Sequence, residues 1–177
     1  KKLNIFGIDN LYKDSFFLDL EKIHYAELNQ EEKEKFLPLF FISQILDELS
    51  LEKLKFSKAD IAKTKLIRKW HYFLKNKNIA QLNELDRFKL HQELEMFLPS
   101  FIFYLPQNLR FNWLKRWRDK DDKLFHPSNL LNGEVIKKNL KIKDGPILGE
   151  LLRYLSQELA YKRLNNFDEA IYKARQW

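Results

Sequence analysis

The scarcity of residues that interrupt helices constrains this chain most. Only four glycines and five prolines are spread over 177 residues, and almost every segment repeats its apolar residues at helical spacing. Glycine and proline are the strongest local breaks in regular structure. The sequence therefore predicts an all-α protein, an irregular bundle of several helices with a C-terminal helical tail.

One loop predicts a domain boundary. His126-Pro127-Ser128-Asn129 combines residues typical of turns, and a chain of this length suffices for one domain or two small ones. We therefore expect a helical body over residues 1–126 and a helical tail over residues 127–177. The chain starts without methionine and ends inside a helical pattern, so we expect it to be a fragment of a longer protein.

Apolar spacing predicts three helical stretches in the body, besides the one described next. The first is an early helix, the second covers residues 31–49 and is largely buried, and the third covers residues 82–105, interrupted near Pro99 and Pro106. Their core candidates are Phe16, Phe17, Leu20 and Ile23 in the first; Phe36, Leu39, Phe40, Phe41, Ile42, Ile45, Leu46 and Leu49 in the second; and Phe97, Leu98, Phe101, Ile102, Phe103 and Leu105 in the third.

A further helix is predicted after Ser57. Ser57 is a good N-cap, and Asp60 three residues later resembles a capping box. A helical wheel separates an apolar side from a cationic side, and a cationic side is either a nucleic-acid contact or an ordinary solvated face. The apolar side holds Ala59, Ala62, Leu66, Ile67, Trp70, Phe73 and Leu74, and the cationic side holds Lys58, Lys65, Arg68, Lys69, Tyr72 and Lys75.

Positive charge is concentrated in the later part of the chain. Residues 1–50 carry 6 Lys/Arg and 10 Asp/Glu, whereas the remainder carries 26 and 15, for a net charge of +7. A positive field confined to one part of a chain favours a polyanionic partner, most simply RNA or DNA.

The segment from Leu109 to Lys120 mixes basic and aromatic residues. Arg110, Trp113 and Trp117 share one helix face, and Arg116, Lys120 and Lys123 form a basic stripe beside it. Arginines hold phosphates bidentately, and an exposed tryptophan can stack on a base. Tryptophans at helical spacing are also typical of a core, so the arginines are the stronger candidates for contact.

The tail predicts a short helix, a turn and a second helix that starts at Gly145-Pro146. Proline at the first helical position sacrifices no hydrogen bond. Flanking glycines leave room for a phosphate to approach the helix amides. The alternative is a helix–helix corner in which the glycines only permit close packing.

Known catalytic patterns are missing from the sequence. It has no cysteine, which excludes disulfides and thiolate chemistry, and its four histidines stand far apart. Asp119-x-Asp121 has the spacing of a two-carboxylate magnesium site but lies in a hydrophilic turn. We predict no catalytic residue and no metal site. Neither a signal peptide nor an apolar run of about 20 residues is present, so we expect a cytoplasmic protein that does not enter a membrane.

Two stretches resemble bacterial tRNA nucleotidyltransferases, the CCA-adding enzymes and related poly(A) polymerases. Leu54-Lys55-Phe56-Ser57-Lys58-Ala59-Asp60-Ile61 is similar to a helix start in the body of that family. The tail matches better, from Leu130-Leu131-Asn132-Gly133 through Asp144-Gly145-Pro146-Ile147-Leu148-Gly149 to Leu151-Leu152, followed by Asn165-Asn166-Phe167-Asp168-Glu169-Ala170. Glu134-Val135 and the aspartate before Gly145 depart from the usual pattern.

The resemblance implies that this chain is the body and tail of such an enzyme without its catalytic head. The head, with its magnesium ions and CTP or ATP, would add nucleotides to an RNA 3′ end, and body and tail would hold the tRNA. We therefore expect no cofactor in this fragment, with tRNA or another structured RNA and the chain's own N-terminal head as partners. A helical protein-interaction or dimerisation module is the alternative.

Residues that could contact the RNA backbone share a positive charge or an accessible helix amide. In the body they are Lys65, Arg68, Lys69, Lys75, Arg110, Arg116, Arg118 and Lys120, and in the tail Lys143, Gly145, Ile147 and Arg153.

Overall fold

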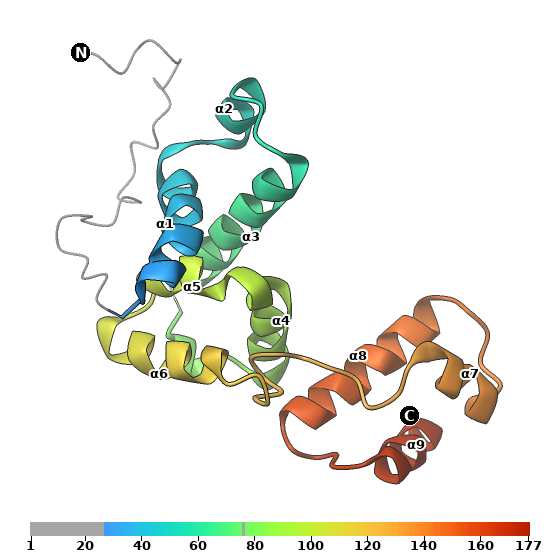
Figure 1. Ribbon diagram of the computed structural model, residues 1–177. Coiled ribbons are helices and arrows are strands. Elements are labelled where there is room, and N and C mark those ends of the chain that lie inside the picture. The colour runs from blue at the N-terminus through green and yellow to red at the C-terminus, as the bar shows by residue number, and fades with distance from the viewer. Residues whose placement is uncertain (1–26, 76) are drawn as a thin grey trace, which may run out of the picture. The chain divides into compact units, whose positions relative to one another are not determined.

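The computed structural model describes residues 27–75 and 77–177, and this part of the chain contains helices and no strand (Figure 1). The all-α prediction is therefore confirmed, while the early helix predicted around Phe16 lies outside the described residues. The chain forms two compact units. The first unit contains the described residues up to Leu82 together with Met96–Arg116, and the second contains Asn83–Glu95 and Trp117–Trp177. The predicted division after residue 126 stays a prediction.

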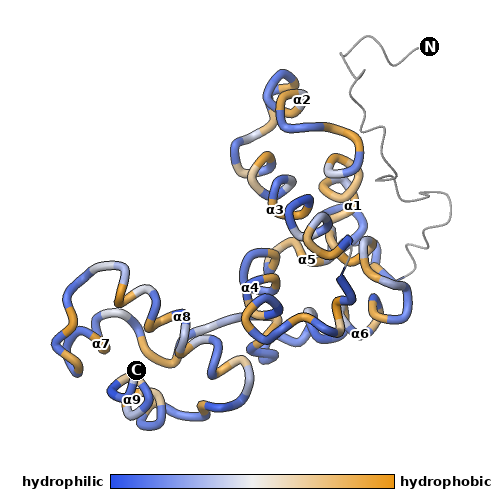
Figure 2. Tube along the Cα trace, turned by 180° about the vertical axis from the view of Figure 1, so that it is seen from behind, coloured by the Kyte–Doolittle hydropathy of each residue, from blue (hydrophilic) through white to orange (hydrophobic). Residues whose placement is uncertain are grey.

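The first unit is built around the packing of α1 against α3 and α5. Phe40, Ile67 and Phe101 are fully buried there, and Figure 2 shows the apolar segments of these helices. Its elements are α1 (Gln30–Ile45), α2 (Glu48–Lys53), α3 (Lys58–Leu74), a 3-10 turn (Ile79–Gln81), α5 (Leu98–Phe101), a second 3-10 turn (Ile102–Tyr104) and most of α6 (Gln107–Arg118).

The single helix predicted over residues 31–49 is in fact two helices. α1 ends at Ile45, and the Asp47 carboxylate accepts a hydrogen bond from the Ser50 amide at 2.7 Å, which starts α2. Phe36 and Phe40 are buried as predicted, but Leu49 is 67% exposed. The apolar pattern does not reveal this break, because the only sequence change it requires is one N-capping residue, Asp47.

The predicted start of α3 is confirmed. Ser57 Oγ accepts a hydrogen bond from the Asp60 amide at 3.1 Å, and its hydroxyl donates to the Asp60 carboxylate at 2.7 Å. The predicted buried face is partly wrong, because Ala59 and Ala62 are exposed whereas Arg68 is buried.

Residues 82–105 form two main helical pieces, with breaks near Pro99 and Pro106 as predicted. α4 (Glu84–Leu94) is followed by a 3-10 turn (Glu95–Phe97), and Pro99 lies in the first turn of α5, where its missing amide costs nothing. Of the predicted core residues in this stretch, those buried are Leu98, Phe101, Ile102, Phe103 and Leu105.

The second unit joins α4 to the tail helices α7 (Gly133–Leu140), α8 (Pro146–Ala160) and α9 (Phe167–Gln176). Glu158 on α8 is buried and forms ion pairs with Arg163 and with Lys173 of α9, while Arg163 also reaches Glu84 of α4 at 2.8 Å. Burial alone would raise the pKa of the Glu158 carboxyl, but the hydrogen bonds from Lys173 and Arg163 outweigh it and lower that pKa. This network ties three helices of the unit together.

None of the helices in the described residues is both long and apolar enough to cross a bilayer.

Candidate nucleic-acid interface

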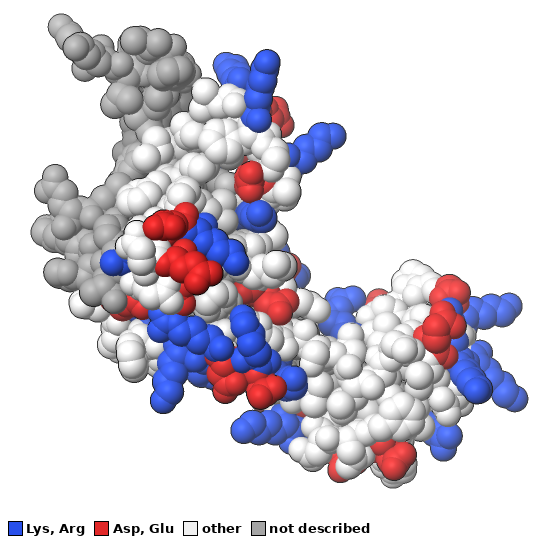
Figure 3. Space-filling model, in the orientation of Figure 1, with Lys and Arg blue, Asp and Glu red and all other residues white. Residues whose placement is uncertain are grey.

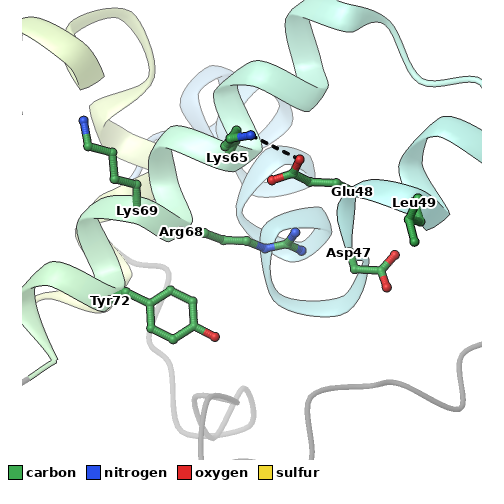
Figure 4. Close-up of a pocket in the computed structure, with 7 residues that line it drawn as sticks. All are labelled: Asp47, Glu48, Leu49, Lys65, Arg68, Lys69 and Tyr72. Atoms are coloured by element: carbon green, nitrogen blue, oxygen red, sulfur yellow. Dashed lines mark hydrogen bonds and ion pairs between the residues drawn. The ribbon is translucent and has the colours of Figure 1, made fainter.

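Three predicted contact residues meet in a pocket beside α3. The pocket has a volume of about 410 Å³ and is shown in Figure 4. Its lining comprises Asp47, Glu48, Leu49, Lys65, Arg68, Lys69 and Tyr72. The three cations are accompanied by two carboxylates, so the pocket partly neutralises its own positive charge.

The helical wheel placed Arg68 on the cationic side of α3, but the structure does not place it on a solvated face. The residue is 7% exposed, and its Nε donates to the Ser43 carbonyl at 3.0 Å. Ser43 belongs to the last turn of α1, where carbonyls lack helical partners and the helix dipole favours a cation. Arg68 therefore holds α3 against the end of α1.

The lysines of α3 remain at the surface. Lys65 forms an ion pair with Glu48 at 3.4 Å, and its side chain is 67% exposed. Lys69 points away from the two carboxylates in Figure 4, with its Nζ 5.3 Å from the Trp70 ring centroid. Lys75 is exposed at the C-cap of α3. These ammonium groups can meet a phosphate without any change in the fold.

Arg110 also bonds to the chain itself. Its guanidinium donates to the carbonyls of Leu105 at 3.1 Å and Phe103 at 3.2 Å. Burial lowers the pKa of Arg110, and the Glu27 charge partly offsets this. Arg116 is half-buried on the same helix. Arg110 thus stabilises the turn that precedes α6.

The end of α6 places two predicted cations in solvent, within the second unit. Arg118 and Lys120 are exposed, and Lys120 Nζ lies 4.7 Å from the centroid of the half-buried Trp117 ring, whose Nε1 donates to the Glu95 carbonyl at 2.7 Å. Figure 3 shows basic side chains gathered over α6, with acidic ones among them. Asp119 accepts a hydrogen bond from the Asp121 amide at 3.0 Å in an exposed turn.

The start of α8 differs from the starts of six other helices. Side chains of Asn, Asp or Ser cap α1, α2, α3, α4, α7 and α9, whereas Gly145 precedes α8 and offers no side-chain cap. The first helical bond is donated by Gly149, at 3.4 Å to the Gly145 carbonyl. The amides of Ile147 and Leu148 precede that bond, so the positive end of the helix carries backbone donors.

The glycines of α8 do not serve packing within the described chain. A Cβ added at Gly145 or Gly149 would meet no atom within 4 Å. Gly145 instead needs to be glycine because its φ is 157°, a conformation that side chains disfavour. Space is therefore open beside the first turn of α8. Phosphate binding at the helix amides requires such space, whereas a closely packed helix–helix corner would fill it.

Of the two predicted tail cations, one precedes the start of α8 in the sequence and the other follows it. Lys143 and Arg153 are exposed, and neither forms an ion pair with another described residue. Lys137 pairs with Glu134 at 2.5 Å and with Asp144 at 3.1 Å, which anchors the turn between α7 and α8. Hydrogen bonds to Glu134 and Asp144 raise the pKa of Lys137.

Sequence reasoning missed a second pocket, at the end of α3, with a volume of about 470 Å³. Its described lining comprises His71, Leu74, Lys75, Lys77, Asn78, Ile79, Phe101, Tyr104, Leu105 and Pro106. Of these residues, only Lys75 was predicted as an RNA contact. The other residues come from two stretches about 30 positions apart, and no local pattern signals that they meet.

The described residues contain no group of three or more His, Asp or Glu side chains arranged to hold a metal ion.

The fold and its surface define a helical protein with exposed cations and an open helix start. The chain is 27% identical, over 137 residues, to the CC-adding tRNA nucleotidyltransferase of Synechocystis sp.. The match covers 73% of this chain and 32% of the relative, so the chain spans about a third of the length of the curated protein it matches. No protein-family model matches the chain, and no solved structure does.

Proposed function

We propose that this chain is an RNA-binding part of an enzyme that adds nucleotides to RNA 3′ ends, with tRNA as its substrate. The similarity to a CC-adding tRNA nucleotidyltransferase over 137 residues carries this proposal. The open, uncapped start of α8 supports it, because backbone amides at the positive end of a helix favour phosphate.

The predicted contact residues divide into two groups: those proposed to bind RNA and those that stabilise the fold. Surface cations, the half-buried Arg116 among them, and the amides after Gly145 meet phosphates, which positions an RNA without reading its sequence. Arg68 and Arg110 hold backbone carbonyls instead. The binding set comprises Lys65, Lys69, Lys75, Arg116, Arg118, Lys120, Lys143, Gly145, Ile147 and Arg153.

Nucleotide transfer itself is assigned to a separate catalytic head, which would bring the magnesium ions and the CTP or ATP. This chain supplies affinity and placement for the RNA, and on its own it transfers nothing.

A competition titration tests the proposal. Fluorescently labelled tRNA is titrated with this chain by anisotropy at low and at physiological salt, with unlabelled tRNA or a duplex DNA of similar charge as competitor. We expect salt-sensitive binding that tRNA displaces better than DNA. Equal competition by DNA would favour a DNA-binding domain. Absence of binding, together with a salt-resistant dimer in sedimentation, would favour an interaction module and overturn the proposal.

A further inference from the structure

The pocket at the end of α3 differs from the pocket around Arg68 in its charge. Its described lining contains Lys75 and Lys77 and no acidic residue, whereas the Arg68 pocket contains Asp47 and Glu48. Both lysines are exposed, and neither forms an ion pair with another described residue. Lys77 Nζ lies 3.7 Å from the centroid of the Phe73 ring. Among the described lining residues, no carboxylate compensates the positive charge at the mouth of this pocket.

The floor of the same pocket is apolar and aromatic. Ile79, Phe101 and Leu105 are buried beneath it. The rings of His71 and Tyr104 pack against each other with centroids 4.3 Å apart, and Tyr104 stacks on Phe101 at 5.7 Å. A flat, largely apolar ligand suits such a floor, since small-molecule pockets are mostly apolar with a few polar groups that fix orientation.

Polar groups on the wall are neutral. Burial, and after it the charge of Lys75, lowers the pKa of His71 to about 4, so that the imidazole is uncharged at neutral pH. An uncharged imidazole both donates and accepts hydrogen bonds. Asn78 accepts a hydrogen bond from the Ala80 amide at 2.9 Å through its side-chain oxygen, which fixes the carboxamide at the rim. These uncharged groups suit hydrogen bonding to the edge of a nucleobase better than binding of a second charged group of the ligand.

We propose that this pocket receives one unpaired nucleotide, its base on the apolar floor and its phosphate between Lys75 and Lys77. The inference rests on the proposed RNA-binding function and goes beyond it, because it assigns base contact to a chain otherwise argued to hold phosphates. Unpaired bases are the parts of an RNA that proteins stack and enclose. A pocket of about 470 Å³ has room for a nucleotide.

Nuclear magnetic resonance titrations of the whole chain test this site with AMP, CMP and inorganic phosphate as separate probes. We expect AMP or CMP to shift the ring signals of His71 and Tyr104, with saturation at millimolar concentration. Phosphate alone should move only the signals near the two lysines. Identical shifts from phosphate and nucleotide, or no shift from any probe, would overturn the proposal.

Two double variants sharpen the test. Lys75→Ala with Lys77→Ala removes the rim charges and should weaken nucleotide binding roughly fivefold. Lys53→Ala with Lys58→Ala removes the same net charge from exposed positions outside the pocket and should leave nucleotide affinity unchanged. Equal weakening by both pairs would show a general charge effect and would contradict a site at the pocket.

The tRNA titration described above separates the two proposals. Binding of tRNA without nucleotide shifts at His71 would refute the pocket and leave the proposed function standing. Nucleotide shifts at His71 in a chain that does not bind tRNA would refute the function and leave a nucleotide site.

Discussion

The Arg68 region of the first unit and the α7–α8 turn of the second unit use positive charge in opposite ways. Around α3, Arg68 is buried on a carbonyl of α1 and Lys65 faces Glu48. Around the start of α8, Lys143 and Arg153 are exposed, and the helix start has no side-chain cap. Sequence charge alone does not separate these regions. A basic residue near a helix C-terminus meets carbonyls of its own chain, whereas a helix N-terminus without a cap leaves donors for a partner.

The largest expected effect follows from removing Arg68. Arg68→Ala leaves the Ser43 carbonyl without its donor and should reduce the free energy of unfolding by about 2–3 kcal/mol in urea denaturation at pH 7. Lys69→Ala, one position along on an exposed side chain, should change it by less than about 0.5 kcal/mol. Equal stability of the two variants would mean that Arg68 is a surface cation after all.

Removing the Glu158 carboxylate should destabilise the second unit somewhat less. Glu158→Gln breaks the ion pairs to Arg163 and Lys173 and should lower the free energy of unfolding by about 1–2 kcal/mol at pH 7. The folded-state pKa of Glu158 lies below its ordinary value of 4.5, so this stabilisation is complete above pH 4.5 and is lost as the pH falls through the folded-state value. The difference between variant and parent should therefore shrink in acid, and a difference independent of pH would contradict the ion-pair account.

Alanine substitutions at the two glycines near the start of α8 should change the free energy of unfolding by smaller amounts, and the two changes should have opposite signs. Gly149→Ala lies at an exposed position of α8 with no atom within 4 Å of the new methyl group and should stabilise the protein by about 0.5–1 kcal/mol. Gly145→Ala meets equally open space but has a φ of 157°, so it should destabilise the protein by about 1 kcal/mol. Thermal unfolding of both variants provides the comparison. Destabilisation by Gly149→Ala would point to close packing that the structure does not show.

Local features were predictable because their causes are local. Ser57 and Asn166 start helices with an acidic residue three positions later, and Pro146 begins α8, as the sequence pattern indicates. The open start of α8 follows from the same stretch, because Gly145 has no side chain to cap it.

Features that depend on distant residues were not predictable. The wheel assigned Arg68 to solvent because its carbonyl partner is 25 positions away on another helix. The second pocket needs His71 and Lys77 to meet Tyr104 through tertiary packing. Asp47 divides one apolar run into two helices, because its side chain caps the backbone of a new helix and so competes with continuation of the first one.

The salt dependence of tRNA affinity tests the central claim that the cations of the binding set and the open α8 start, and not the buried arginines, hold the RNA. The logarithm of the association constant is measured against the logarithm of salt concentration for the parent chain, for Lys143→Ala with Arg153→Ala, and for a control pair of exposed lysines outside the binding set, Lys35→Ala with Lys53→Ala. The account predicts a steep negative slope for the parent, a slope shallower by about 1–2 for the tail pair, and an unchanged slope for the control pair. A parent affinity that does not change with salt, or the same slope in all three proteins, would contradict it.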